Sequence, residues 1–206
     1  MKKFWQNYLW NCIEQQISRW VSLNDKVGFD KLMATVNTYQ DSDGLLKFFP
    51  RMNNGSLILT QTILEMLSEI GWHLPKDVEE KSLSALEDHV RGLLRNSDLN
   101  YLGLNQKQDV LLISFAVLSR YHRLDAHSFE GLYQQIKPRL STMATAQWID
   151  LLYILRNETK LLNRQDRQVQ IENKIQSRLH VESRRITLSQ DNTESGWLMM
   201  RSQSMV

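Results

Sequence analysis

The stretch "LTQTILEMLSEIGWHLP", residues 59–75, indicates which secondary structure builds this chain. Its apolar residues recur every three or four positions, which is the spacing of one face of an α-helix rather than the alternation of a strand. They are Leu59, Ile63, Met66, Leu67 and Ile70. Pro75 then suits the start of another helix, because its missing N–H leaves no hydrogen bond unmade there. The pattern predicts two successive helices joined by a short turn.

The same helical spacing continues along the chain. Three apolar stripes and a fourth, more polar one follow: Leu83, Leu86, Val90 and Leu93; Val110, Ile113, Val117 and Tyr121; Trp148, Leu152 and Leu155; Val169, Glu172, Ile175 and Leu179. Asn105 with Gln108 is typical of a capping box at a helix start, and Pro138 of a helix end. We expect residues 41–55 to form the longest irregular stretch. Mixed-charge runs at residues 156–168 and 180–185 are expected to be solvated helix faces.

These patterns predict an all-α fold of about nine helices. The chain has only eight glycines and three prolines, and no Asn-Gly turn lies between alternating segments, so strands are not expected. Helix pairs follow one another every forty to fifty residues or so, which favours stacked antiparallel hairpins in an α-solenoid or an α/α toroid.

The composition excludes several classes of function. The net charge is +2, from 25 basic and 23 acidic residues, which is too balanced for nucleic acid or anionic lipid as a main partner. One cysteine allows neither an internal disulfide nor a zinc site with two thiolates, and no cofactor is expected. No apolar run is long enough to span a bilayer, and the start "MKKFWQNYLWNC" lacks the apolar stretch of a signal peptide.

The single cysteine lies in "WNCIEQQ", residues 10–16, three residues before a glutamine. Asn11 and Glu14 have the spacing of an Asn-x-x-Glu capping box, which would make Cys12 the first helical residue. The positive end of the helix dipole favours the thiolate form of a cysteine there. Cys12 and Gln15 then share a helix face, with Cβ atoms about 5–6 Å apart.

This placement permits one unusual reaction. Attack of the Cys12 sulfur on the side-chain amide carbon of Gln15, with loss of ammonia, gives an internal thioester. Ordinary amides do not react in this way, so the fold would have to hold the pair in near-attack geometry. Trp5, Tyr8 and Trp10 are apolar bodies that could keep water from such a bond. The same four-residue spacing also fits an inert, buried cysteine, and the spacing alone leaves both interpretations open.

The longer stretch "YLWNCIEQQISRW", residues 8–20, resembles the thioester signature of bacterial alpha-2-macroglobulins, approximately Tyr-Pro-Tyr-Gly-Cys-x-Glu-Gln-x-x-Ser-Arg. The matching residues are Tyr8, Cys12, Glu14, Gln15, Ser18 and Arg19. Residues 43–75 resemble the stretch that follows in that family, with an Asp-Gly loop, a Leu-Thr helix and a Gly-aromatic-x-Leu-Pro turn. Leu9, Trp10 and Asn11 depart from the signature, where it has proline, tyrosine and glycine, but they leave the reacting pair intact.

The resemblance implies that residues 1–206 form part of an α/α-toroid thioester domain, with the thioester motif at residues 8–19. Cys12 and Gln15 would be the thioester pair, and Tyr8, Trp10, Asn11 and Glu14 would support it. The implied function is single-turnover trapping of proteases, not enzymatic turnover. The implied partners are target proteases and the remaining macroglobulin domains, in the periplasm or cell envelope. A whole toroid needs more helix pairs than this chain supplies, so we expect a fragment.

Two other classes of function stay open. One is a helical scaffold, descended from such a domain, that works by protein contacts without a reactive bond. The other is an α/α-toroid glycosidase using an acid pair such as Asp41 with Asp43, although nothing places a second carboxylate across an aromatic cleft. His122 and His127 are possible general bases, but their polar surroundings favour surface positions.

Overall fold

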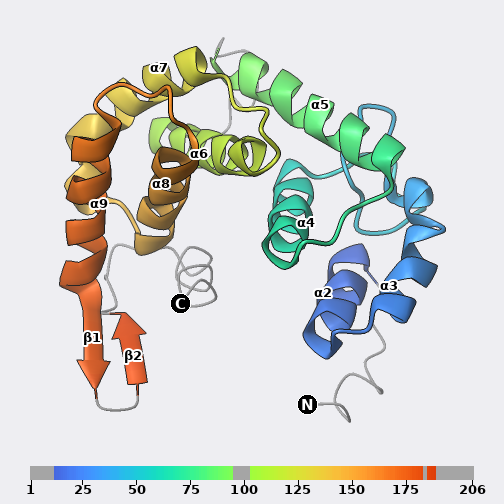
Figure 1. Ribbon diagram of the computed structural model, residues 1–206. Helices are drawn as coiled ribbons and strands as arrows, with labels where there is room; N and C mark the ends of the chain where they lie inside the picture. The colour runs from blue at the N-terminus through green and yellow to red at the C-terminus, as the bar shows by residue number, and fades with distance from the viewer. Residues whose placement is uncertain (1–11, 95–102, 183–184, 189–206) are drawn as a thin grey trace. The chain divides into compact units, whose positions relative to one another are not determined.

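The computed structural model describes residues 12–94, 103–182 and 185–188 of the chain (Figure 1). They belong to two compact units, residues 1–100 and 101–206. Within the described residues there are eight α-helices, so the predicted all-α class is confirmed. None of these helices is long and apolar enough to cross a membrane. The toroidal closure of the helix pairs stays a prediction.

The described residues of the first unit form four α-helices and one 3-10 helix. They are α2 (Ile13–Leu23), α3 (Lys26–Met33), η1 (Val36–Tyr39), α4 (Leu57–Ile70) and α5 (Lys76–Leu94). Helix α2 packs on α3 and α4, and α4 also packs on α5 (Figure 1). Helix α2 therefore has two sides covered, which is what buries its apolar residues Ile13 and Ile17.

Helix α4 is the helix predicted from the opening stretch. The Ser56 hydroxyl caps its start by accepting a hydrogen bond from the Leu59 amide at 3.3 Å. Gly71 ends it in the left-handed conformation at φ 68°, which glycine adopts without the steric cost that other residues bear. Helix α5 begins directly after Pro75, as expected. The stretch between η1 and α4 is irregular, which confirms that prediction.

In the second unit, the part of the chain that the structure describes forms four α-helices, one 3-10 helix and a short hairpin. They are α6 (Leu104–Arg120), α7 (Ala126–Ile136), η2 (Lys137–Thr142), α8 (Thr145–Asn157), α9 (Arg164–Arg178), β1 (Leu179–Glu182) and β2 (Arg185–Leu188). Helix α8 packs against both α6 and α9. The rings of Phe115 on α6 and Phe129 on α7 meet edge to face at 5.8 Å, and both side chains are fully buried. This aromatic pair lies at the centre of the unit's core.

Two local predictions, for the two ends of this unit, are wrong. Strands β1 and β2 form an antiparallel pair with Leu179 opposite Leu188, where no strand was expected. Helix α6 begins after Gly103, where the Gln106 side chain accepts a hydrogen bond from the Gly103 amide at 3.0 Å. This capping contact lies two residues before the predicted pair, Asn105 and Gln108. Gln108 is buried, and its side-chain oxygen accepts no hydrogen bond among the described residues, so it does not act as a cap.

Helix α9 also buries a different face from the one predicted. Val169 is 55% exposed, whereas Ile171 is buried, and Arg167 is only 7% exposed. The Arg167 guanidinium donates to both carboxylate oxygens of Glu130, at 3.0 and 2.9 Å, and lies 3.9 Å from the ring centre of Tyr133. Arg167 belongs to the mixed-charge segment 156–168 that was expected to be solvated, but it is buried and paired with Glu130. A buried arginine needs such a partner, because its charge is costly to remove from water.

The N-cap of α7 gives a pH-dependent prediction. The Asp125 carboxylate accepts from the amides of His127 and Ser128, both at 3.3 Å, and from the Ser128 hydroxyl. These hydrogen bonds, that of the Ser128 hydroxyl foremost, hold the pKa of Asp125 below its ordinary value. Because the pKa of Asp125 is lower in the folded state, its carboxylate stabilises the fold fully above the unfolded-state pKa of about 3.9. This stabilisation is lost as the pH falls through the folded-state pKa.

We therefore expect Asp125→Ala to lower the free energy of unfolding by about 1 kcal/mol near pH 7. The difference from the wild type should shrink as the pH falls below about 4, because the protonated carboxyl is a weaker cap. Urea unfolding of both proteins across this pH range measures it. A difference that stays constant down to the acid limit would contradict the role assigned to the carboxylate.

Candidate functional site

Cys12 is the N-cap residue of α2 and is buried, with 8% of its surface exposed. Its backbone is extended, at φ −69° and ψ 155°, and its carbonyl accepts the first helical hydrogen bond from the Gln16 amide at 3.0 Å. The prediction that Asn11 is the N-cap and Cys12 the first helical residue is therefore wrong by one position. Asn11, Tyr8 and Trp10 lie outside the described residues, and the roles predicted for them stay predictions.

The start of α2 is capped by a distant loop and not by a side chain. The Ile13 amide, the first of the helix, donates to the backbone carbonyl of Phe48 at 3.0 Å. No side chain caps the N-terminus, and the Cys12 sulfur is not used for that purpose. The register of the helix start is thus set by a tertiary contact with a distant part of the chain, which the local sequence does not reveal.

Gln15 lies in the same first turn, three residues after Cys12. It is half-buried, and its side-chain oxygen Oε1 is fully buried with no hydrogen-bond partner among the described residues. An unpaired buried carbonyl costs about 1–3 kcal/mol, so such groups are rare in native structures. Glu14, also half-buried, places a negative charge in the first turn, where it interacts favourably with the helix dipole. The predicted pair Cys12 and Gln15 therefore shares one largely buried helical turn.

The irregular segment between η1 and α4 is fixed by one carboxylate. Asp41 Oδ1 accepts from the amides of Asp43 and Leu45, at 3.0 and 2.8 Å, and Oδ2 accepts from the Gly55 amide at 2.6 Å. Because Asp41 and Gly55 lie at opposite ends of the segment, this side chain closes it into a loop. Both oxygens of this carboxylate are bound to the loop backbone, which counts against the glycosidase alternative.

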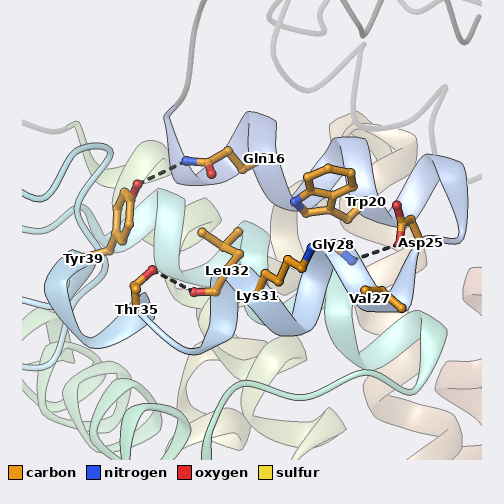
Figure 2. Close-up of a pocket in the computed structure, with 9 residues that line it drawn as sticks. All are labelled: Gln16, Trp20, Asp25, Val27, Gly28, Lys31, Leu32, Thr35 and Tyr39. Atoms are coloured by element: carbon orange, nitrogen blue, oxygen red, sulfur yellow. Dashed lines mark hydrogen bonds between the residues drawn. The ribbon is translucent and has the colours of Figure 1, made fainter.

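A pocket of about 380 Å³ lies beside the first turn of α2, between α2, α3 and η1 (Figure 2). Gln16 and Trp20 line it from α2, and the Gln16 amide nitrogen donates to the Tyr39 hydroxyl at 3.1 Å. The Trp20 indole lies against Gly28 of α3, where a Cβ would come within 2.5 Å of the ring. Cys12 and Gln15 do not line this pocket.

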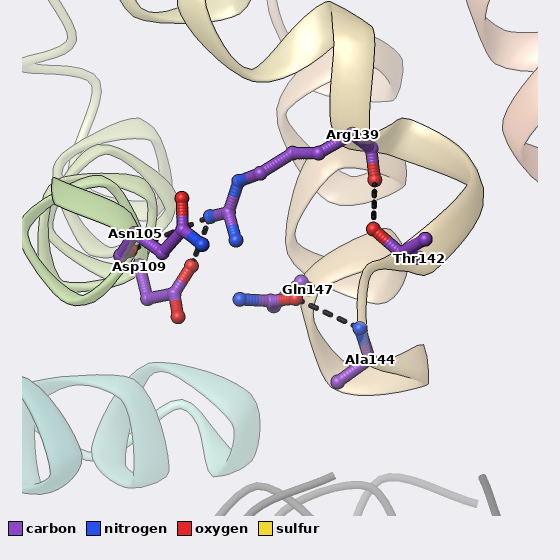
Figure 3. A network of polar contacts seen from close by, with 6 residues as sticks. All are labelled: Asn105, Asp109, Arg139, Thr142, Ala144 and Gln147. Atoms are coloured by element: carbon purple, nitrogen blue, oxygen red, sulfur yellow. Dashed lines mark hydrogen bonds and ion pairs between the residues drawn. The ribbon is translucent and has the colours of Figure 1, made fainter. Parts of the chain in front are cut away.

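The second unit holds a polar network at the start of α6 (Figure 3). Arg139 of η2 pairs with Asp109, and Gln147 accepts a hydrogen bond from the Ala144 amide at 2.8 Å. Burial raises the pKa of Asp109, and its side-chain hydrogen bonds with Arg139 and with Gln147 of α8 lower it in part. These contacts join α6, η2 and the start of α8, so the network has a structural role.

No other catalytic centre is evident in the described parts of the chain. No group of histidine, cysteine, aspartate and glutamate residues could hold a metal ion among the described residues. His122 and His127 are both exposed, which agrees with the surface positions expected for them. Cys12 and Gln15 are thus the candidate reactive residues of the described chain.

Comparison with known proteins gives one kind of match, which is structural. No sequence model of a protein family matches the chain, and no curated protein matches it either. The fold is similar to the native conformation of E. coli alpha-2-macroglobulin, with a TM-score of 0.59 and 13% identity over 84% of this chain and 12% of that one.

A second structure agrees with the first. It is native alpha-2-macroglobulin from E. coli, spanning domain MG7 to the C-terminus, with a TM-score of 0.56 and 13% identity over 83% of this chain and 30% of that chain. The predicted resemblance to bacterial alpha-2-macroglobulins is therefore confirmed for the fold. This chain spans less than a third of the length of either matched chain.

Proposed function

We propose that this chain is a thioester-bearing domain of a bacterial alpha-2-macroglobulin, a protein that traps proteases by covalent capture. The observation that carries the proposal is the first turn of α2, where a buried Cys12 precedes Gln15 by three residues. The signature around residues 8–19 and the similar fold of E. coli alpha-2-macroglobulin support it independently. Tyr8, Trp10 and Asn11 would shield and order the turn, and Glu14 would stabilise the helix start.

The proposed bond forms by acyl transfer within the turn. The Cys12 sulfur attacks the side-chain carbonyl carbon of Gln15, a carbon–sulfur bond forms, and the carbon–nitrogen bond breaks. The amide nitrogen leaves as ammonia and takes the proton of the thiol with it. Proximity is the main source of rate, because the two groups are held at the start of one helix.

The unpaired oxygen of Gln15 is consistent with this product. A thioester carbonyl is a weaker hydrogen-bond acceptor than an amide carbonyl, because sulfur donates less electron density to it than nitrogen does. Burying it without a partner therefore costs less than burying the amide. Conversion of Gln15 to the thioester would lower the cost of leaving this buried oxygen without a partner.

Capture then consumes the bond once. A nucleophile such as a lysine amine of a protease attacks the Gln15 carbonyl, an amide bond forms, the carbon–sulfur bond breaks, and the proton released by the amine restores the Cys12 thiol. The chain would thus act as an inhibitor module and not as an enzyme. Its partners would be proteases and the other macroglobulin domains, in the periplasm or cell envelope.

Uptake of a labelled primary amine tests this function in the purified chain. We expect one label per chain, located by peptide mapping at Gln15, together with the appearance of one titratable thiol at Cys12. A chain that takes up no label while its thiol titrates at once would support the alternative, a helical scaffold that works through protein contacts.

A further inference from the structure

Helix η1 and the loop between η1 and α4 hold the first turn of α2 at both of its ends. At the start of the turn, the Phe48 carbonyl accepts from the Ile13 amide at 3.0 Å. At its end, the Tyr39 hydroxyl accepts from the Gln16 side chain at 3.1 Å. Ile13 directly follows Cys12, and Gln16 directly follows Gln15, so each contact holds a residue next to one member of the reacting pair.

The first half of the loop is fixed by several hydrogen bonds of its own. The Lys47 amide donates to the Tyr39 carbonyl at 2.6 Å, and the Leu46 amide donates to the Thr60 hydroxyl at 2.8 Å. The Ser56 amide donates to the Leu46 carbonyl at 2.8 Å and brings the far end of the loop alongside. Phe48 follows this anchored part directly, and its carbonyl is the group that reaches α2.

The second half of the loop, residues 48–55, returns to the first half through Asp41. Its own hydrogen bonds are short-range, such as the Met52 amide to the Phe49 carbonyl at 3.1 Å and the Lys47 ammonium to the Pro50 carbonyl at 3.0 Å. The Gly55 amide, by contrast, donates to Asp41 at 2.6 Å across 14 residues. A hydrogen bond to an ionised carboxylate is roughly twice as strong as a neutral one.

We propose that Asp41 is a positioning residue for the thioester of Cys12 and Gln15. Its carboxylate closes the loop, the closed loop presents the Phe48 carbonyl to Ile13, and this contact sets the backbone from which the Cys12 sulfur approaches Gln15. The inference rests on the proposed function and adds to it a residue that contacts neither reacting group. A misplacement of about 1 Å in such a turn can slow a reaction about 100-fold.

The test is Asp41→Asn in the full chain, with Asp25→Asn as the matched control. The asparagine side chain presents one acceptor oxygen, and its NH₂ group faces amide donors where an acceptor is needed. Asp25 is another carboxylate of the same unit that accepts a backbone hydrogen bond, from Gly28 at 2.9 Å, but it caps α3 and takes no part in the loop. Both variants lose one charge and keep the size of the side chain.

Two readouts are measured on each protein: the fraction of chains whose mass is short by one ammonia, and hydrogen exchange of the Ile13 amide. We expect Asp41→Asn to reduce the ammonia-deficient fraction at least tenfold and to expose the Ile13 amide, with α4 and α5 still protected. Asp25→Asn should retain both properties. Equal losses in the two variants, or an unchanged fraction in Asp41→Asn, would overturn the inference.

Failure of the proposed function gives a different result. The wild type itself would then have its full mass, and the ammonia-deficient fraction would be absent from all three proteins. Exchange of the Ile13 amide still decides the structural link in that case. Protection that Asp41→Asn leaves unchanged would overturn it, and protection that is lost only in Asp41→Asn would support it.

Discussion

Replacement of Cys12 by serine should abolish amine uptake at Gln15 and leave the fold intact. A serine hydroxyl is far less nucleophilic than a cysteine thiolate, so no acyl bond to Gln15 forms and uptake falls to background. Serine is also among the preferred N-cap residues, and position 12 is the N-cap of α2, where the cysteine makes no capping hydrogen bond. We therefore expect the free energy of unfolding to equal that of the wild type or to exceed it by about 0.5–1 kcal/mol.

A variant of the other partner gives the matched control. Gln15→Glu keeps the shape of the side chain, but its carboxylate does not undergo attack by a thiolate. Glutamate at the third helical position is favourable, because it is three residues after the N-cap and near the positive end of the helix dipole. Amine uptake should be absent in both variants, measured beside thermal unfolding. Uptake at the wild-type level in either one would place the reactive bond elsewhere.

The largest expected loss of stability in the first unit comes from Gly44→Ala. Gly44 has a φ of 96°, and a Cβ there would lie 2.5 Å from the backbone carbonyl oxygen of Lys81. The residue has little freedom to move away, because its own carbonyl accepts from Gln40 at 3.0 Å and from Ser82 at 2.9 Å. Backbone strain and steric overlap each cost about 1–3 kcal/mol, so we expect a loss of roughly 3 kcal/mol or more in urea unfolding.

Gly71→Ala separates the two causes of that loss. Gly71 is also left-handed, at φ 68°, but a Cβ there would meet no atom within 4 Å. Its replacement by alanine should lower the free energy of unfolding through backbone strain alone, by about 1–2 kcal/mol. A Gly44→Ala variant no less stable than Gly71→Ala would show that the loop is not tightly packed against α5, and the positioning role of the loop would lose its basis.

Local patterns were sufficient to predict most of the helices and the irregular stretch. Helix α4 has a capping serine, a regular apolar stripe and a left-handed glycine, all within its own sequence. The start of α2 was misplaced by one residue because the Phe48 carbonyl caps it from a distance. The pair Cys12 and Gln15 was found from its signature, whereas the role of Asp41 depends on a loop closure across 14 residues that no local pattern contains.

The errors in the second unit have a similar origin. Arg167 was expected on a solvated face because its neighbours are charged, but its burial depends on Glu130 and Tyr133, which lie on another helix. The hairpin of β1 and β2 was not predicted because no Asn-Gly turn joins its strands. The β-branched residues Val181, Ile186 and Thr187 were the available signal, since such residues favour strands.

The most direct test of the account is the intact mass and free-thiol content of the freshly purified chain, with and without methylamine. We predict a mass short by one ammonia and no titratable thiol before treatment. Methylamine should then add its own mass and release one thiol, that of Cys12. A full mass with an immediately titratable thiol would contradict the central claim, and the resemblance to alpha-2-macroglobulin would then extend to the fold and not to the chemistry.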